Sequence, residues 1–258
     1  MRARIRGWLT AVYAGLSMAF FFFASIPVML VTRSGDLPMW FARRAWAPWG
    51  LRVAGVRLEV AFLSPLPEGP AIFAANHESA LDIWAVITAI PRGVRFAAKA
   101  ELFRIPVFGW YLTVGGHIRV DRGNHAAAVA SLAAAAAKVR AGTSLIVFPE
   151  GTRSRDGRVH AFKKGPFVLA LRAGVPVVPV AVTGSGAVTP KALLHVTPGA
   201  IRVTVGTPVS PSEFPDRLAL LREVRRRIIE MHRAAGGMGG DLDASVAARG
   251  FEGDAGAD

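Results

Sequence analysis

The longest apolar stretch of the chain lies at its N-terminus. From Gly7 to Thr32 no charged residue occurs, and Phe20–Phe23 is an unbroken aromatic block. A helix needs about 20 such residues to cross a bilayer, so this stretch is long enough. Basic residues precede it, as in a signal peptide, but it is longer than the apolar core of a cleaved signal and no clear cleavage site follows. We therefore expect a retained membrane anchor.

Basic residues flank the anchor on both sides, so the positive-inside rule gives no clean orientation. A hairpin that re-enters one leaflet is an alternative to a spanning helix. The following segment, Leu37–Val53, places Trp40 and Trp49 among arginines. This mixture suits a lipid headgroup layer, although a helix packed on the domain would also explain it.

Beyond Gly55, short apolar runs alternate with helical patterns. The predicted strands are Val56–Phe62, Ala71–Ala75, Val94–Lys99, His117–Val120, Ser144–Phe148, Val175–Val182 and Ile201–Val205. The predicted helices are Ser79–Ile90, Pro106–Val114, Asn124–Arg140, Gly165–Ala173 and a basic amphipathic helix within Pro211–Ala235. This alternation predicts an α/β fold with a mixed, largely parallel central sheet flanked by helices and preceded by an N-terminal membrane-associated helical segment.

These patterns divide the chain into three parts. We expect N-terminal membrane-anchoring helices at residues 1–54, the α/β domain at 55–235, and a disordered glycine-rich tail at 236–258.

The composition indicates an anionic partner. The chain has 31 Lys and Arg against 18 Asp and Glu, a formal net charge of +13. Anionic lipid and nucleic acid both fit this charge. A nucleic-acid surface would interleave aromatic and basic residues within the folded domain, yet most of the six tryptophans lie in the first fifty residues. The chain has no cysteine, which excludes a disulfide scaffold, a thiolate metal site and a cysteine nucleophile.

His77 and Asp82 are candidates for acid–base chemistry. A spacing of five on one helix would rotate them apart by about 140°, so we expect His77 in the loop after Ala71–Ala75. Asp82 would then lie in the first turn of the next helix and reach back to the imidazole, fixing its tautomer and leaving one nitrogen free to take a proton. Ser79 and Asp82 also fit a helix capping box, so a structural interpretation stays open. Glu78 receives no role.

The segment Phe148–Ser154 offers an anion-binding turn. It places Glu150 and Arg153 on a glycine turn after an apolar strand, where α/β sheets place their ligands. An arginine can bind phosphate through two hydrogen bonds, and Gly151 lets the backbone approach closely. A structural turn with a salt bridge is the alternative. Further cations follow other predicted strands or open a helix, and could converge on the same crevice: Lys99, Arg119, Arg122, Lys163 and Lys164.

Together these blocks resemble the glycerolipid acyltransferases typified by the bacterial 1-acyl-sn-glycerol-3-phosphate acyltransferases. The similarity runs from about Ile72 to Val182 and rests on ordered blocks: Asn76–Asp82, Lys99–Leu102 with Pro106 and Gly109, Gly116–Arg122, Phe148–Ser154 and Val175–Val180. One position departs from the family pattern. Arg119 stands where the family usually has an aromatic or aliphatic residue, which bears on the acceptor head group.

The resemblance implies an O-acyltransferase of phospholipid synthesis. His77 would deprotonate the sn-2 hydroxyl of a lysophosphatidic acid, and Asp82 would orient the ring. The alkoxide would attack an acyl thioester, either acyl-CoA or acyl-carrier protein, and give phosphatidic acid. No cofactor and no metal would be required.

The resemblance also implies the substrate-binding residues, which are Lys99, Arg122, Glu150, Gly151, Thr152 and Arg153. Pro179 would line or support an acyl pocket. The protein would sit at the inner membrane with its active site facing the cytoplasm and would bind no nucleic acid. Two alternatives are an acyltransferase of the same fold acting on another lysolipid, such as a lyso-aminolipid, and a non-catalytic basic membrane-binding protein.

Overall fold

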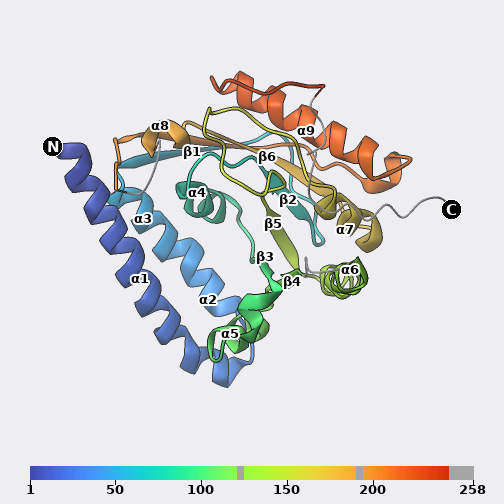
Figure 1. Cartoon of the computed structure of the whole chain (residues 1–258), viewed down its shortest axis with the longest axis horizontal. Helices are drawn as coiled ribbons and strands as arrows, with labels where there is room; N and C mark the ends of the chain where they lie inside the picture. Colours follow the sequence, from blue (N-terminus) through green and yellow to red (C-terminus); the bar gives the residue numbers. More distant parts are fainter. Residues whose placement is uncertain (121–124, 190–193, 244–258) are drawn as a thin grey trace.

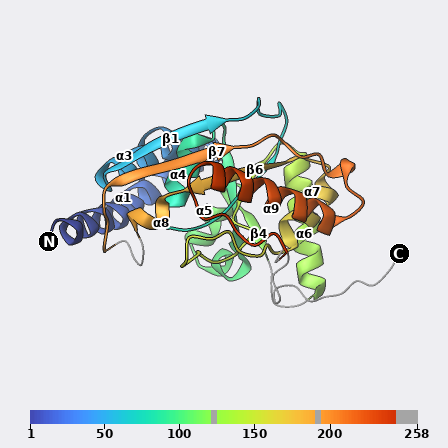
Figure 2. The same ribbon diagram turned by 90° about the horizontal axis from the view of Figure 1, so that it is seen from above.

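The computed structural model describes residues 1–120, 125–189 and 194–243. Within these residues one sheet has the strand order β1-β7-β6-β2-β5-β3-β4. The strands are β1 Val56–Phe62, β2 Ile72–Ala75, β3 Val94–Lys99, β4 Ile118–Val120, β5 Ser144–Val147, β6 Val177–Thr183 and β7 Gly199–Val205. Neighbouring strands are parallel except β6 and β7, which are antiparallel. The predicted mixed, largely parallel sheet is confirmed, and Figure 2 shows β1 and β7 side by side at its edge.

Helices cover both faces of the sheet (Figure 1). One face carries α6 His125–Arg140, α7 Gly165–Ala173 and α9 Arg217–Ala234; the other carries α3 Ala47–Val53 and α4 Leu81–Ala89. The shorter elements are η2 Ala100–Arg104, α5 Phe108–Val114, α8 Ser185–Val188 and η3 Pro211–Glu213. This is the α/β arrangement that the sequence predicts.

Strand β2 shows why the pattern selects this fold. All four of its residues are buried. Ile72 and Ala74 belong to the core under α6, α7 and α9, whereas Phe73 and Ala75 belong to the core under α3 and α4. Alternate side chains of a strand point to opposite faces of the sheet. A strand whose residues are all apolar therefore has to be covered by helices on both faces. Because β2, β5 and β3 are parallel neighbours, their carboxyl ends meet at one edge of the sheet.

The N-terminal segment forms a helical hairpin. Helix α1, Arg2–Thr32, is long and apolar enough to cross a membrane and is the one such helix in the described ranges. The chain then returns beside it through α2 Asp36–Phe41, the π-helix η1 Ala42–Trp46 and α3 (Figure 1). The large apolar residues of α1 that stay exposed are Ile5, Trp8, Leu9, Val12, Leu16, Met18, Phe20, Phe23, Leu30 and Val31.

The tryptophans of the returning segment fit both interpretations, since one packs on the domain and two are exposed. Trp46 packs edge-on against Trp84 of α4, with ring centroids 5.6 Å apart, and its indole N–H donates to the Ser17 hydroxyl at 2.8 Å. Trp40 and Trp49 are exposed. The segment is therefore attached to the domain and also presents tryptophans outward.

The first residues of the predicted tail contact the domain. Residues up to 243 are described, and the Gly239 carbonyl accepts a hydrogen bond from the Val159 N–H at 2.8 Å. Arg233 donates to the Gly240 carbonyl at 2.7 Å. Gly239 and Gly240 thus lie against the domain through their backbone carbonyls. Residues 244–258, and the predicted helix start at Asn124, lie outside the described residues.

Candidate active site

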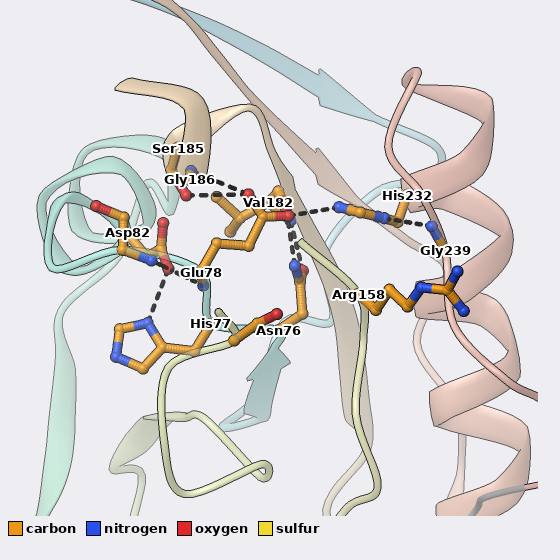
Figure 3. Close-up of polar contacts among 12 residues, drawn as sticks. Asn76, His77, Glu78, Asp82, Arg158, Val182, Ser185, Gly186, His232 and Gly239 are labelled. Atoms are coloured by element: carbon orange, nitrogen blue, oxygen red, sulfur yellow. Dashed lines mark hydrogen bonds and ion pairs between the residues drawn. The ribbon is translucent and has the colours of Figure 1, made fainter. Parts of the chain in front are cut away.

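His77 and Asp82 form a hydrogen-bonded pair at the carboxyl end of β2. His77 lies in the loop after the strand, and Asp82 lies in the first turn of α4. The imidazole Nδ1 is 2.7 Å from Asp82 Oδ2 (Figure 3). The Asp82 side chain is completely buried, whereas that of His77 keeps 14% of its surface exposed. A carboxylate that accepts the Nδ1–H leaves the Nε2 lone pair free to act as a base.

The same carboxylate oxygen also binds the backbone that leads into α4. Asp82 Oδ2 accepts the backbone N–H groups of Glu78 and Ser79 at 2.7 and 2.8 Å. The Ser79 hydroxyl accepts the Leu81 N–H at 3.2 Å and bonds the Thr189 hydroxyl. The structural and the functional interpretation of Asp82 are therefore compatible, because one oxygen binds both the imidazole and two backbone N–H groups, which fix the Asp82 rotamer.

The loop that follows β5 holds His77 from its other side. The His77 N–H donates to Glu150 Oε1 at 2.9 Å, and the His77 carbonyl accepts the Ser154 N–H at 2.7 Å. Glu150 Oε2 accepts the His160 N–H at 3.1 Å. Both carboxylate oxygens of this buried residue thus bond to backbone N–H groups. This geometry gives Glu150 a positioning role beside His77, and the direct substrate contact that the family resemblance implies stays a prediction.

Burial also shifts the titration of Glu150. It raises the pKa of this carboxyl to about 7. The two backbone N–H donors oppose the rise, and the nearby carboxylates of Asp82 and Glu78 add to it. A carboxyl with this pKa changes charge near neutral pH.

The turn after Glu150 brings a lysine to the site. Gly151 has a φ of +73°, and a Cβ built there would lie 2.5 Å from Lys163 Nζ. The backbone conformation thus favours glycine, and a side chain at this position would displace the Lys163 ammonium. Thr152 and Arg153, the next residues of the turn, are exposed. The turn therefore presents cationic and hydroxyl groups beside the loop that carries His77.

Comparisons with known proteins agree with this site. Residues 57–183 match the family model described as Acyltransferase. A 1-acyl-sn-glycerol-3-phosphate acyltransferase of Pseudomonas aeruginosa is 33% identical over 181 residues, which are 69% of this chain and 70% of that protein. The chain belongs to the 1-acyl-sn-glycerol-3-phosphate acyltransferase family. The resemblance seen in the motifs is confirmed.

Two further relatives extend the match. A chloroplastic 1-acyl-sn-glycerol-3-phosphate acyltransferase of Arabidopsis thaliana, LPAT1, is 31% identical over 240 residues, which cover 89% of this chain. The chain spans 65% of that relative's length. The crystal structure of the 1-acyl-sn-glycerophosphate acyltransferase PlsC from Thermotoga maritima has a TM-score of 0.73 and 26% identity, and the match covers 92% of this chain and 98% of that one. The N-terminal hairpin and the sheet thus form the fold of this acyltransferase family.

Three further cationic residues named in the sequence analysis belong to β3 or β4 or follow β4 in the sequence. Lys99 is the last residue of β3, in register with Val120 of β4. Arg122 lies two residues beyond β4, outside the described residues. Arg119, the departure from the family pattern, is exposed on β4 and lines a cavity of about 340 Å³ together with Lys138 of α6.

Pro179 occupies the interior of the domain. It lies in β6, where all residues are buried, and its register partner is Ala74 of β2. Its ring and Met231 of α9 both lie against Gly206. At this position Pro179 can support the packing of α9 on the sheet.

Sequence reasoning missed several residues that shape the site. The Asn76 amide donates to the Val182 carbonyl at 2.8 Å and accepts the Val182 N–H at 2.7 Å, which joins the end of β2 to β6. Glu78 pairs with His232 of α9 at 2.6 Å. The signal that could have found this pair is a glutamate next to the candidate base together with a histidine on a helix that is otherwise rich in arginine.

The described part of the chain contains no group of three His, Asp or Glu side chains placed to hold a metal ion. The absence of a metal or cofactor requirement stays a prediction.

Proposed function

We propose that this acyltransferase transfers a fatty acyl group from an acyl thioester to the sn-2 hydroxyl of 1-acyl-sn-glycerol-3-phosphate and forms phosphatidic acid. One observation carries the proposal: the His77–Asp82 pair, with its ring partly accessible, lies beside a cationic glycine turn. The Pseudomonas aeruginosa and Arabidopsis thaliana relatives are both named 1-acyl-sn-glycerol-3-phosphate acyltransferases, which supports the same acceptor.

The geometry supplies a direct transfer mechanism. Asp82 accepts the Nδ1–H of His77, so Nε2 takes the proton of the acceptor hydroxyl as its oxygen attacks the thioester carbonyl carbon. The new C–O bond forms and the C–S bond breaks, and the imidazolium then returns the proton to the departing thiolate, which gives the free thiol and neutral His77. Asp82 stabilises the imidazolium between these steps. The hydroxyl of Ser79 is committed to Leu81 and Thr189, so no acyl-serine intermediate is invoked.

The cations of the crevice bind the phosphate in this proposal. Arg153 and Thr152 extend from the turn, Lys99 is the last residue of β3, and Arg122 follows β4 by two residues in the sequence. Guanidinium and ammonium groups suit a phosphomonoester because they combine charge with several hydrogen-bond donors. Glu150 and Gly151 support the turn, and Pro179 supports the sheet below it.

The N-terminal hairpin supports a location of this site at a membrane. The exposed apolar side chains of α1 and the outward Trp40 and Trp49 give it a surface suited to lipid. A lysolipid acceptor resides in one leaflet, so an anchored domain meets its substrate there. We place the protein at the inner membrane with the site facing the cytoplasm, where acyl-CoA or acyl-carrier protein supplies the acyl group. The reaction needs no metal or cofactor.

A head-group panel tests the proposal. Purified protein is given lysophosphatidic acid, lysophosphatidylcholine or a lyso-aminolipid, each with acyl-CoA or acyl-carrier protein, and thiol release and diacyl product are measured. We expect transfer to lysophosphatidic acid. Activity confined to acceptors without a terminal phosphate would contradict the assigned role of Arg153 and Arg122. Binding to anionic vesicles without transfer to any acceptor would instead show a membrane-binding protein.

A further inference from the structure

Glu78 and His232 form a buried pair on the side of the catalytic loop away from His77. The two neighbouring side chains point in opposite directions, as Figure 3 shows: His77 toward Asp82, and Glu78 toward α9. Glu78 Oε1 is 2.6 Å from His232 Nε2, and the exposed fractions of the two side chains are 6% and 1%. Glu78 Oε2 accepts the Gly186 N–H at 3.1 Å.

The partners of His232 fix its tautomer. Its Nδ1 accepts the Gly239 N–H at 3.0 Å, so that nitrogen carries no proton. The proton of the neutral ring is then on Nε2, which donates to Glu78. Gly237 permits this arrangement, because a Cβ there would lie 2.2 Å from the imidazole ring. A glutamate that is buried this deeply requires such donors.

These contacts close a ring of bonds around the catalytic loop. From Glu78 the ring passes to His232, then to Gly239, whose carbonyl accepts the Val159 N–H. The residue after Val159, His160, donates its N–H to Glu150, and Glu150 accepts the N–H of His77. The covalent bond between His77 and Glu78 completes it. Loop, helix α9 and the segment after it thus restrain one another.

Besides His77 itself, the backbone of Glu78 links the ring to the catalytic carboxylate. The backbone N–H of Glu78 donates to Asp82 Oδ2, the oxygen that binds the His77 imidazole. A change in the Glu78 side chain therefore moves the N–H that helps to orient Asp82. A displacement of about 1 Å in such a site can reduce a rate about a hundredfold.

We propose that Glu78 and His232 are positioning residues for the base: through their hydrogen bond, α9 and residues 236–240 hold the His77–Asp82 pair in its reactive orientation. The proposal rests on the proposed function and deepens it. It also assigns a role to a region outside the matched family segment, which ends at residue 183.

Two substitutions of similar polarity test the contact. In His232→Gln an amide nitrogen can still donate to Glu78, whereas in His232→Asn the shorter side chain keeps an acceptor for Gly239 but cannot reach Glu78. We expect His232→Asn to lower kcat about tenfold or more with the acceptor KM nearly unchanged, and His232→Gln to recover most of the rate. Rates are compared per folded molecule, with melting temperature measured on each variant. Equal rates in the two variants, or a lower melting temperature in His232→Asn with wild-type kcat, would overturn the proposal.

A second measurement needs no substrate. In the NMR spectrum of the full chain, the Nδ1–H proton of His77 is identified by its loss in His77→Ala. We expect this resonance to persist in His232→Gln and to broaden through solvent exchange in His232→Asn. An unchanged resonance in His232→Asn overturns the positioning role even if the protein transfers no acyl group. Absence of transfer by the wild-type protein, with the expected NMR result, would reject the proposed function and leave the positioning role in place.

Discussion

The imidazole of His77 stacks on the phenyl ring of Phe148, with 4.2 Å between ring centroids and 23° between ring planes. His77 follows β2 and Phe148 follows β5, and these strands are parallel neighbours. Their carboxyl ends therefore bring the two sequence motifs together at one edge of the sheet. The stack, the bond to Asp82 and the backbone bonds to Glu150 and Ser154 leave the imidazole little freedom.

Loss of the stack should slow the reaction without weakening substrate binding. Aromatic pairs of this kind contribute about 0.5–1.5 kcal/mol, which corresponds to a rate loss of roughly two- to tenfold. We expect Phe148→Leu to lower kcat by this factor with the acceptor KM unchanged. Phe148→Tyr retains the ring and serves as the control. Wild-type kcat in Phe148→Leu would show that the stack does not orient the base.

The pKa of Glu150 predicts how stability depends on pH. The folded value of about 7 lies above the ordinary value of 4.5, so the folded state holds the proton more tightly than the unfolded state. The resulting stabilisation is fully present below pH 4.5 and is lost as pH rises through 7; it is on the order of 3 kcal/mol.

Glu150→Gln cannot titrate, so it should lack this component of the pH dependence. The measurement is the free energy of unfolding of detergent-solubilised protein in urea, at several pH values between 4.5 and 8. Wild-type stability should decline relative to the variant over that range. Parallel curves for the two proteins would mean that the pKa of Glu150 is not raised.

Alanine substitutions at two glycines distinguish the effect of backbone strain on stability from an effect on acceptor binding. Gly151 and Gly174 both have positive φ, at +73° and +66°, so an alanine at either should cost about 1–2 kcal/mol of stability. Only at Gly151 would the new Cβ displace Lys163, because nothing lies within 4 Å of a Cβ at Gly174. We expect Gly151→Ala to raise the KM for the phosphate-bearing acceptor and Gly174→Ala to leave it unchanged. If both variants had the same KM, Lys163 would have no role in binding the phosphate of the acceptor.

The local elements could be predicted because their signals are local. Strands β1 and β3 and helix α7 begin and end at the predicted residues, where apolar runs are bounded by proline, glycine or charged residues. The position of Asp82 in a first helical turn also followed from spacing. The largely parallel sheet followed from alternating strands and helices.

Contacts between distant segments could not be predicted in this way. Nothing local shows that β7 runs antiparallel to β6, or that Glu78 binds a histidine 154 residues further along the chain. Substrate binding by Glu150 was implied by the family resemblance, which does not show how the side chain is packed. Its burial against two backbone N–H groups depends on how β2, β5 and the loop at His160 meet. The tail was expected to be disordered because it is rich in glycine. Composition does not reveal that the carbonyls of Gly239 and Gly240 accept hydrogen bonds from the domain.

The most direct test of the account is thiol release by His77→Ala in the presence of lysophosphatidic acid and acyl-CoA. His195→Ala, which alters an exposed histidine, is the matched control. If His77 is the base, its loss should lower kcat by roughly a hundred- to ten-thousandfold while the melting temperature stays close to that of the wild type. The control should keep the wild-type rate. Undiminished thiol release by folded His77→Ala would contradict the mechanism.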